Sequence, residues 1–162
     1  MFTGTELRVL RQNCGLTQED VAEYIGCGLR SVKRWEAGKS RISDRVVSIL
    51  QKINDALNCY AAEVLKAYAD QAEKIDPDEL PEACLIVYDD DDADLVDWSL
   101  PFHSHAAAIF KAFQLLRKNG VPARIVKFQR ADYFFSWLKD RKDTPATRSA
   151  WAALQTKKDK AA

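Results

Sequence analysis

The stretch Thr17–Trp35 constrains the fold of this chain most strongly, because its spacing predicts two short helices joined by a tight turn. Thr17 can cap the first of them, with Asp20 three residues later in a near-capping-box arrangement. Gly26 lies at the turn, where a positive φ is expected and glycine adopts it without steric cost. The residues expected to face inward from the two helices are Val21, Ala22, Ile25, Val32 and Trp35.

The second of these helices also carries basic residues on its outer side. Arg30 and Arg34 are four residues apart and offset from the apolar face, so they should point together into solvent or into a groove. Residues 28–45 hold six basic residues against two acidic ones, and such a local excess is what contact with phosphates requires. The formal net charge of zero for the whole chain does not argue against nucleic acid, since the charges are segregated along the sequence.

These residues resemble the Xre family of bacterial and phage repressors, also called Cro/C1-type. The matching segments are Leu16–Ala22, Gly26 and Ser31–Ser40, and the resemblance covers roughly residues 3–55. It implies a lambda-repressor-like helical domain whose helix-turn-helix places its second helix in the major groove of DNA.

The resemblance also implies which residues contact DNA. The first residues of the recognition helix touch base edges in this family, and by alignment these positions are Gly28, Leu29, Arg30 and Arg34. Leu29 could touch only an apolar feature such as a thymine methyl group. The family uses the glutamine at Gln18 to hold a phosphate and brace the recognition helix. The phosphate contacts that we expect are therefore Gln18, Lys33, Lys39 and Arg41.

Helices should flank the motif on both sides. Thr3 and Glu6 fit a capping box that starts a helix running to about Asn13. A long helix begins at Asp44, capped by Ser43, and apolar residues four and three apart form a heptad seam along it. The seam consists of Val46, Leu50, Ile53, Leu57, Tyr60, Val64 and Ala67. Its second part can pack either on the C-terminal half or on its counterpart in a second chain.

The remaining sequence predicts a small α/β region. The expected elements, in order, are a strand over 83–88, an acidic loop over 89–97, a helix over 104–118, a strand over 121–128, and helices over 131–138 and 145–154. Strand, helix and strand in this order suggest a right-handed unit with two parallel strands. We therefore predict an α+β, mostly α, fold. Its parts are a helix-turn-helix domain (1–57), a connecting helix and linker (58–82), a βαβαα module (83–155) and a disordered basic tail (156–162).

Two parallel strands are too few to be stable alone, so helices of the same chain or the strands of a second copy must complete the sheet. A second copy would also supply the two-fold symmetry that an operator reader needs, and we predict that residues 83–155 form a dimerisation module. The arrangement resembles the YdiL-type bacterial proteins and the anti-CRISPR-associated repressors of phages. That resemblance rests on Leu85–Tyr88, Asn119-Gly120, Ala123–Phe128, Tyr133–Leu138, Asp143–Pro145 and Trp151, and it implies a dimeric, autoregulating repressor.

Other chemistry finds less support in the sequence. The acidic run that starts at Asp89 could hold a metal ion, but it matches neither an EF-hand nor a haloacid-dehalogenase-type pattern, and we interpret it as a solvated loop. His103 and His105 should diverge at a helix start, where Ser104 serves as a cap. The remaining aromatic residues could stack on bases, but their helical spacing favours a core role. They are Trp98, Phe102, Tyr133, Phe134, Phe135, Trp137 and Trp151.

The prediction is therefore a non-enzymatic, sequence-specific DNA-binding transcriptional regulator, dimeric and reading a palindromic double-stranded operator, without a cofactor or a metal. RNA is not excluded as a partner. The alternative is an antitoxin-like or effector-binding interaction protein whose C-terminal half binds a protein or a small molecule. Four scattered cysteines and the lack of a signal peptide or membrane span favour a cytoplasmic protein.

Overall fold

The computed structural model describes residues 2–76 and 81–161, and the chain divides into two compact units. The first unit comprises Met1–Tyr60 and Asp97–Ala108, and the second comprises Ala61–Val96 and Ile109–Ala162. Two of the three boundaries fall inside helices, α4 (Asp44–Ala72) and α5 (Ser104–Lys118), so each unit contains part of both.

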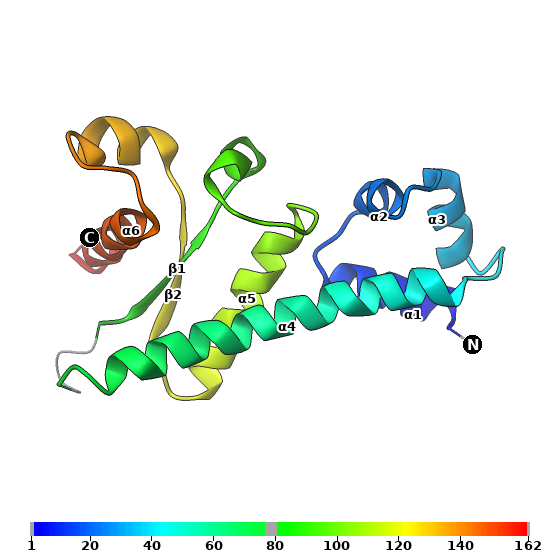
Figure 1. Cartoon of the computed structure of the whole chain (residues 1–162), viewed down its shortest axis with the longest axis horizontal. Helices are drawn as coiled ribbons and strands as arrows, with labels where there is room; N and C mark the ends of the chain where they lie inside the picture. Colours follow the sequence, from blue (N-terminus) through cyan, green and yellow to red (C-terminus); the bar gives the residue numbers. More distant parts are fainter. Residues whose placement is uncertain (1, 77–80, 162) are drawn as a thin grey trace. The chain divides into compact units, whose positions relative to one another are not determined.

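Four helices build most of the first unit (Figure 1). They are α1 (Gly4–Asn13), α2 (Gln18–Ile25), α3 (Leu29–Glu36) and the first part of α4. The predicted capping boxes are confirmed: Thr3 and Glu6 bond reciprocally at the start of α1, and Thr17 and Asp20 do so at the start of α2. These side chains satisfy backbone N–H groups that have no partner in a helical first turn.

The turn between α2 and α3 requires the glycine that stands there. Gly26 has φ of +73° and ψ of +43°, in the left-handed region, as expected from the sequence. The loop from α3 to α4 begins in the same way, since Gly38 has φ of +68°. Ser43 then accepts a hydrogen bond from the Val46 N–H at 3.4 Å at the beginning of α4.

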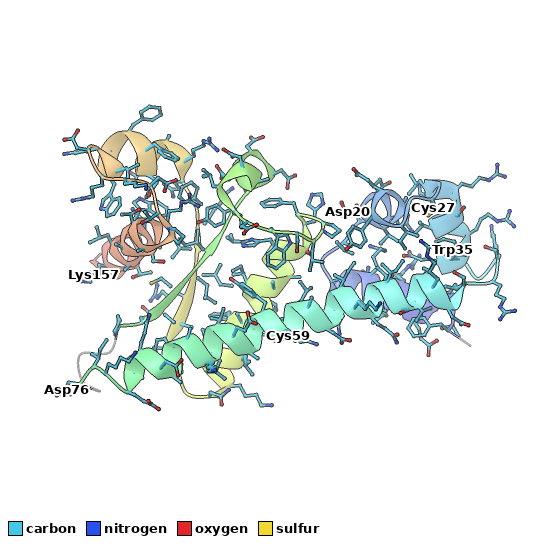
Figure 2. All side chains as sticks on the ribbon, in the orientation of Figure 1. Asp20, Cys27, Trp35, Cys59, Asp76 and Lys157 are labelled. Atoms are coloured by element: carbon cyan, nitrogen blue, oxygen red, sulfur yellow. The ribbon has the colours of Figure 1, made fainter. Side chains whose placement is uncertain are left out.

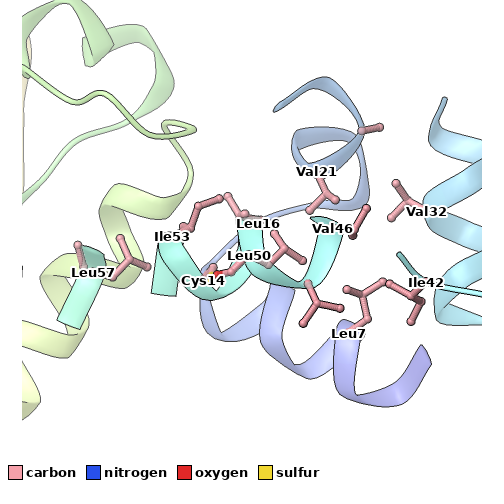
Figure 3. Packing of buried hydrophobic residues seen from close by; sticks show 13 residues of the cluster. Leu7, Cys14, Leu16, Val21, Val32, Ile42, Val46, Leu50, Ile53 and Leu57 are labelled. Atoms are coloured by element: carbon pink, nitrogen blue, oxygen red, sulfur yellow. Dashed lines mark hydrogen bonds between the residues drawn. The ribbon is translucent and has the colours of Figure 1, made fainter. Parts of the chain in front are cut away.

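The core of the first unit joins all four helices. Figure 3 shows Leu7 of α1, Val21 of α2, Val32 of α3 and Val46 of α4 directed toward a common interior. The part of the α4 seam that lies in this unit is buried, as predicted, at Val46, Leu50, Ile53 and Leu57. Burial of these side chains is the main source of stability that holds α3 in place.

The second unit contains a sheet of two parallel strands, β1 (Ala83–Val87) and β2 (Ala123–Lys127). The strands pair in register, Ala83 opposite Ala123 and Val87 opposite Lys127, and α5 is the crossover between them. Figure 1 shows the strands between α6 (Pro145–Ala161) on one side and the second part of α5 on the other.

An aromatic cluster fills the space between the sheet and α6. Phe128, Tyr133 and Trp151 are buried in it, with ring centroids 5.2–6.0 Å apart. The indole N–H of Trp151 donates to Asp132 at 2.8 Å, so the one polar group of this buried ring is satisfied. Most of the predicted aromatic residues are therefore core, but Phe135 is 86% exposed and the core interpretation is wrong for it.

The predicted fold class is confirmed: the chain is a mostly helical α+β protein with a helical N-terminal part, a long helix and a C-terminal α/β part with parallel strands. Several element details differ. The acidic run folds into the short 3₁₀ helix η2 (Asp90–Leu95), and the aromatic helix is the π-helix η3 (Asp132–Leu138).

The predicted tail is also different, because α6 continues to Ala161 instead of ending at Leu154. The sequence there has neither glycine nor proline and is rich in lysine, which is a good helix former. Residues 77–80 of the predicted linker lie outside the described residues, as do Met1 and Ala162.

The two units are divided differently from the domains that we expected from the sequence. Residues 97–108, which we placed in the C-terminal module, group with the helix-turn-helix unit. Within the described ranges, none of the helices combines the length and the apolar character that crossing a membrane requires.

Candidate nucleic-acid interface

The position of α3 is set by its inner face. Val32 is fully buried and Trp35 packs partly buried against the same core. Arg30 and Arg34 lie on the other side of the helix and are exposed, and Figure 2 shows nitrogen-tipped side chains projecting from α3 into open space. Core packing therefore orients the helix and leaves its basic side available.

The two guanidinium groups are not held by acidic side chains. Within residues 2–76 and 81–161, neither Arg30 nor Arg34 forms an ion pair. Arg34 donates one long hydrogen bond of 3.4 Å to the carbonyl of Lys39. A bond of this length is weak, so both groups can donate their fork of N–H groups to a ligand.

The first residues of α3 are less polar. Gly28 is the exposed N-cap residue, in an extended conformation, and makes no side-chain cap bond because it has no side chain. Leu29 is half-buried and packs partly against the core of the first unit. Part of its apolar side chain therefore serves the fold, and only the remainder can face a groove.

A buried carboxylate at the end of α3 ties this helix to α1 and α2. Glu36 is 7% exposed, and its oxygens accept from Arg11 Nε at 2.6 Å and from Gln18 Nε2 at 2.7 Å. A second Arg11 bond of 3.2 Å and an Arg8 bond of 3.4 Å complete the set. Burial raises the pKa of the Glu36 carboxyl, but the hydrogen bonds from Arg11 and Gln18 outweigh burial and lower the pKa below its usual value.

Our sequence reasoning missed this network, although a signal for it was present. Glu36 stands four residues after Val32, on the apolar face of a helix, and a buried carboxylate needs a cation or several donors. The network also places Gln18, which we expected at a phosphate. Its Nε2 group is bonded to Glu36, so the bracing part of its expected role matches the geometry.

The remaining expected phosphate contacts lie at the end of α3 and in the loop that follows. Lys33, Lys39 and Arg41 are all exposed. Lys39 and Arg41 line a cavity of about 480 Å³ between this loop and the start of α1. Gly4 allows the close approach of α1, because a Cβ atom there would lie 2.3 Å from the carbonyl oxygen of Trp35.

A segment from the C-terminal half completes the first unit. His103 Nδ1 lies 2.9 Å and 3.0 Å from the two carboxylate oxygens of Asp20, at the N-terminal end of α2. Burial raises the pKa of Asp20, but the backbone N–H of Thr17 and the His103 ring outweigh it, and the pKa is lowered. The sequence did not predict this contact, because spacing does not reveal a partner 83 positions away.

The second histidine of this segment is part of the core. His105 is 4% exposed, with its ring stacked on Phe102 at 5.9 Å and edge-on to Trp98 at 5.2 Å. Burial lowers the pKa of its imidazole. Trp98 in turn packs edge-on against Tyr60 at 5.6 Å and donates to the Ser104 hydroxyl at 3.0 Å. Ser104 therefore accepts a hydrogen bond in the interior as well as standing at the helix start.

The acidic segment is exposed at most of its carboxylates, as expected of a solvated segment, but Asp92 is an exception. Asp92 is 5% exposed and lies 3.4 Å from Arg130 Nη1, which also bonds Asp94 at 2.9 Å. Arg148 donates to the carbonyl of Leu95 at the end of η2. No group of three or more ligand-type side chains suited to a metal ion occurs among the described residues.

Comparison with known proteins agrees with the geometry of the first unit. Residues 7–64 match a family model described as Helix-turn-helix. These residues form a helix-turn-helix domain of the Xre (Cro/C1-type) kind, which indicates DNA binding and a regulator rather than an enzyme. No curated protein matches the chain.

Proposed function

We propose that the protein is a sequence-specific transcriptional repressor that binds a palindromic DNA operator as a dimer and reads it through the major groove. The observation that carries this proposal is the exposure of the Arg30 and Arg34 guanidinium groups on a helix that is fixed by core packing and by the Glu36 network. An α-helix fits the major groove of B-form DNA, and arginine is the side chain best matched to the O6 and N7 atoms of guanine.

The roles divide by position. Base contacts are assigned to Gly28, Leu29, Arg30 and Arg34, at the exposed side and the start of α3. Phosphate contacts are assigned to Gln18, Lys33, Lys39 and Arg41. Gln18 lies at the start of α2, where backbone N–H groups favour an anion, and its amide nitrogen has a second N–H group besides the one bonded to Glu36. Autoregulation is part of this proposal, and structured RNA is the alternative ligand for the same surface.

Two substitutions distinguish the recognition of bases from the binding of phosphates. Arg30→Ala should weaken binding to the preferred operator by about 1–3 kcal/mol and relax the preference at one base pair. Lys39→Ala should weaken all sequences alike, because a phosphate contact carries no sequence information. Affinities for a selected operator and for random DNA, measured at the same salt concentration, distinguish the two effects. Equal losses on both DNAs for Arg30→Ala would remove Arg30 from the base contacts.

A cavity in the second unit supports a second candidate function, the binding of an effector or a protein partner. It measures about 440 Å³ and is lined by α4, β1 and α6, including Val64, Leu85 and Ala153. Its size suits a small apolar ligand. Ala153→Trp should fill it, and a compound or partner that co-purifies with the wild type should then be lost, whereas Arg30→Ala should retain it. Retention by Ala153→Trp would remove the cavity from this role.

A further inference from the structure

Among the described residues the sheet of the second unit has two strands, so each strand has one side on which its backbone groups face no other described strand. An isolated pair of strands is marginal in water, and an unpaired edge is a template for another strand.

The register of the sheet shows which backbone groups are free. The Ala83 N–H donates to the Pro122 carbonyl, and the Phe128 N–H donates to the Val87 carbonyl. With Leu85 opposite Ile125, the same parallel pattern uses the N–H and C=O groups of Arg124 and Val126 toward β1. The N–H and C=O groups of Ala123, Ile125 and Lys127 therefore point to the outer edge of β2.

The two edges differ in what surrounds them. The first residues of β1 line the 440 Å³ cavity together with side chains of α4 and α6, so a strand added there would have to enter a hollow between two helices. On β2, Ile125 is 39% exposed, and Phe110 of α5 in the same unit is 51% exposed. The exposed apolar side chain of Ile125 thus stands on an unpaired edge, where it can pack against a cross-strand neighbour of an added strand.

The charges on β2 do not oppose a second copy of the same strand. Arg124 pairs with Glu82 at 3.1 Å and Lys127 pairs with Asp89 at 2.8 Å, both acids belonging to the chain around β1. Each cation on the strand thus has its own counter-charge within the unit. A like-charged strand could otherwise be repelled, and cationic side chains are a common protection of open edges.

From these observations we infer that two copies of this chain pair through the outer edge of β2, antiparallel and with Ile125 on the two-fold axis. In this register Ala123 lies opposite Lys127 of the second copy, Arg124 lies opposite Val126, and Ile125 lies opposite itself. No like charges stand directly opposite each other. The outward N–H and C=O groups of all three edge residues find partners, and the two sheets become one sheet of four strands.

The second copy is favoured over another partner because the strand is complementary to itself in this register. An isologous contact of this kind also closes the assembly at two chains and gives it the two-fold axis of a palindromic operator. The inference therefore rests on the proposed function, which requires a dimer, and it identifies the outer edge of β2 as the dimer interface. It predicts that Ile125 is the residue whose replacement most affects dimerisation.

Sedimentation of the full chain at micromolar concentration tests this surface. The wild type should be a dimer, and Ile125→Lys should raise the dimer dissociation constant at least tenfold, because it places two ammonium groups across the axis. Its side chain is partly exposed, so the monomer should keep its circular dichroism and melting temperature. Val9→Lys is the matched control, since Val9 is an apolar α1 residue that is 59% exposed, and it should leave the dimer intact.

A backbone variant tests the strand pairing itself. Ile125→Pro removes an N–H group that β1 does not use, and proline is tolerated on edge strands, so the fold should survive while the dimer dissociates. Ile125→Val keeps the N–H group and should remain dimeric. A wild type that is monomeric, or an Ile125→Lys chain that dimerises as tightly as the wild type, would overturn the inference.

The outcome is separable from that of the proposed function. If Ile125→Lys is monomeric and binds a single half-site but not a two-half-site operator with high affinity, both proposals are supported. If the wild type dimerises through this edge yet binds no DNA preferentially, the surface stands and the repressor function fails. If the wild type binds a specific DNA sequence but Ile125→Lys stays dimeric, the repressor function stands and the β2 surface is not the dimer interface.

Discussion

Glu36 is the single residue that most directly links the fold of the first unit to its basic surface. Its carboxylate holds Arg11 of α1 and Gln18 of α2 at the end of α3. Glu36→Ala should lower the free energy of unfolding by about 3–5 kcal/mol, because it leaves the Arg11 charge buried without its partner. Urea unfolding measures the loss.

Glu23→Ala is the matched control for this change. Glu23 is an exposed residue of α2, and its replacement should alter the free energy of unfolding by no more than about 0.5 kcal/mol. Equal effects of the two substitutions would show that the Glu36 network does not stabilise the unit.

The same carboxylate makes stability depend on pH. Hydrogen bonds lower the pKa of Glu36 and of Asp20 in the folded chain, while in the unfolded chain both titrate near about pH 4. The unfolded state therefore binds protons first as pH falls. The stabilisation is present in full above about pH 5 and is lost as pH drops through the lowered folded-state pKa values.

Urea unfolding of the wild type and of Glu36→Gln between pH 3 and pH 7 checks this dependence. The wild type should lose stability more steeply on the acid side, so that the two proteins converge at low pH. A constant difference between them over the whole range would contradict the sign of the pKa shift at Glu36.

At the scale of single residues, sequence reasoning found those whose role is local. Thr3, Thr17 and Gly26 act on backbone within four positions of themselves, and their caps and positive φ were predicted. It missed Arg11 and His103, whose partners Glu36 and Asp20 are 25 and 83 positions away. Only the folded chain brings these charges together.

At the scale of elements, α5 begins against the loop that precedes α2. Gly15 has φ of +71°, and a Cβ atom there would lie 2.9 Å from the Cβ of Ala107. Gly26 has nearly the same φ, +73°, with no atom within 4 Å of an added Cβ. The two glycines therefore share the backbone constraint and differ in packing.

Alanine at both positions separates these contributions. Gly26→Ala should cost about 1–2 kcal/mol from the left-handed conformation alone. Gly15→Ala should cost about 1–3 kcal/mol more, because the added methyl group clashes with Ala107. The measurement is the midpoint of urea unfolding, and equal costs would mean that the segment 97–108 does not pack here in solution.

The elements were predicted well where the hydrophobic periodicity and the helix start and stop residues agree. The helix Ser104–Lys118 has the predicted bounds, since Pro101 precedes it and Asn119-Gly120 ends it. The acidic run and the aromatic helix were predicted less well, because the 3₁₀ form of η2 and the π form of η3 depend on contacts with Arg130, Arg148 and the aromatic core. Local propensity does not carry that information.

At the scale of the whole molecule, the predicted order of parts is confirmed, from helical N-terminal part through long helix to parallel strands. The sequence did not reveal that residues 97–108 group with the first unit. The apolar residues Trp98 and Leu100 of this segment pack against a core cluster that consists mostly of residues before position 61. Sequence order alone groups such a segment with the residues that precede and follow it.

The central claim is that α3 reads DNA sequence, and selection from random double-stranded oligonucleotides at a stated salt concentration tests it most directly. The wild type should enrich two inverted half-sites with centres about 10 base pairs apart or a multiple of that distance. Guanine should recur in each half-site, and Arg30→Ala should relax one position. Recovery of pools with no preferred sequence, bound only through salt-sensitive attraction to phosphates, would contradict the account.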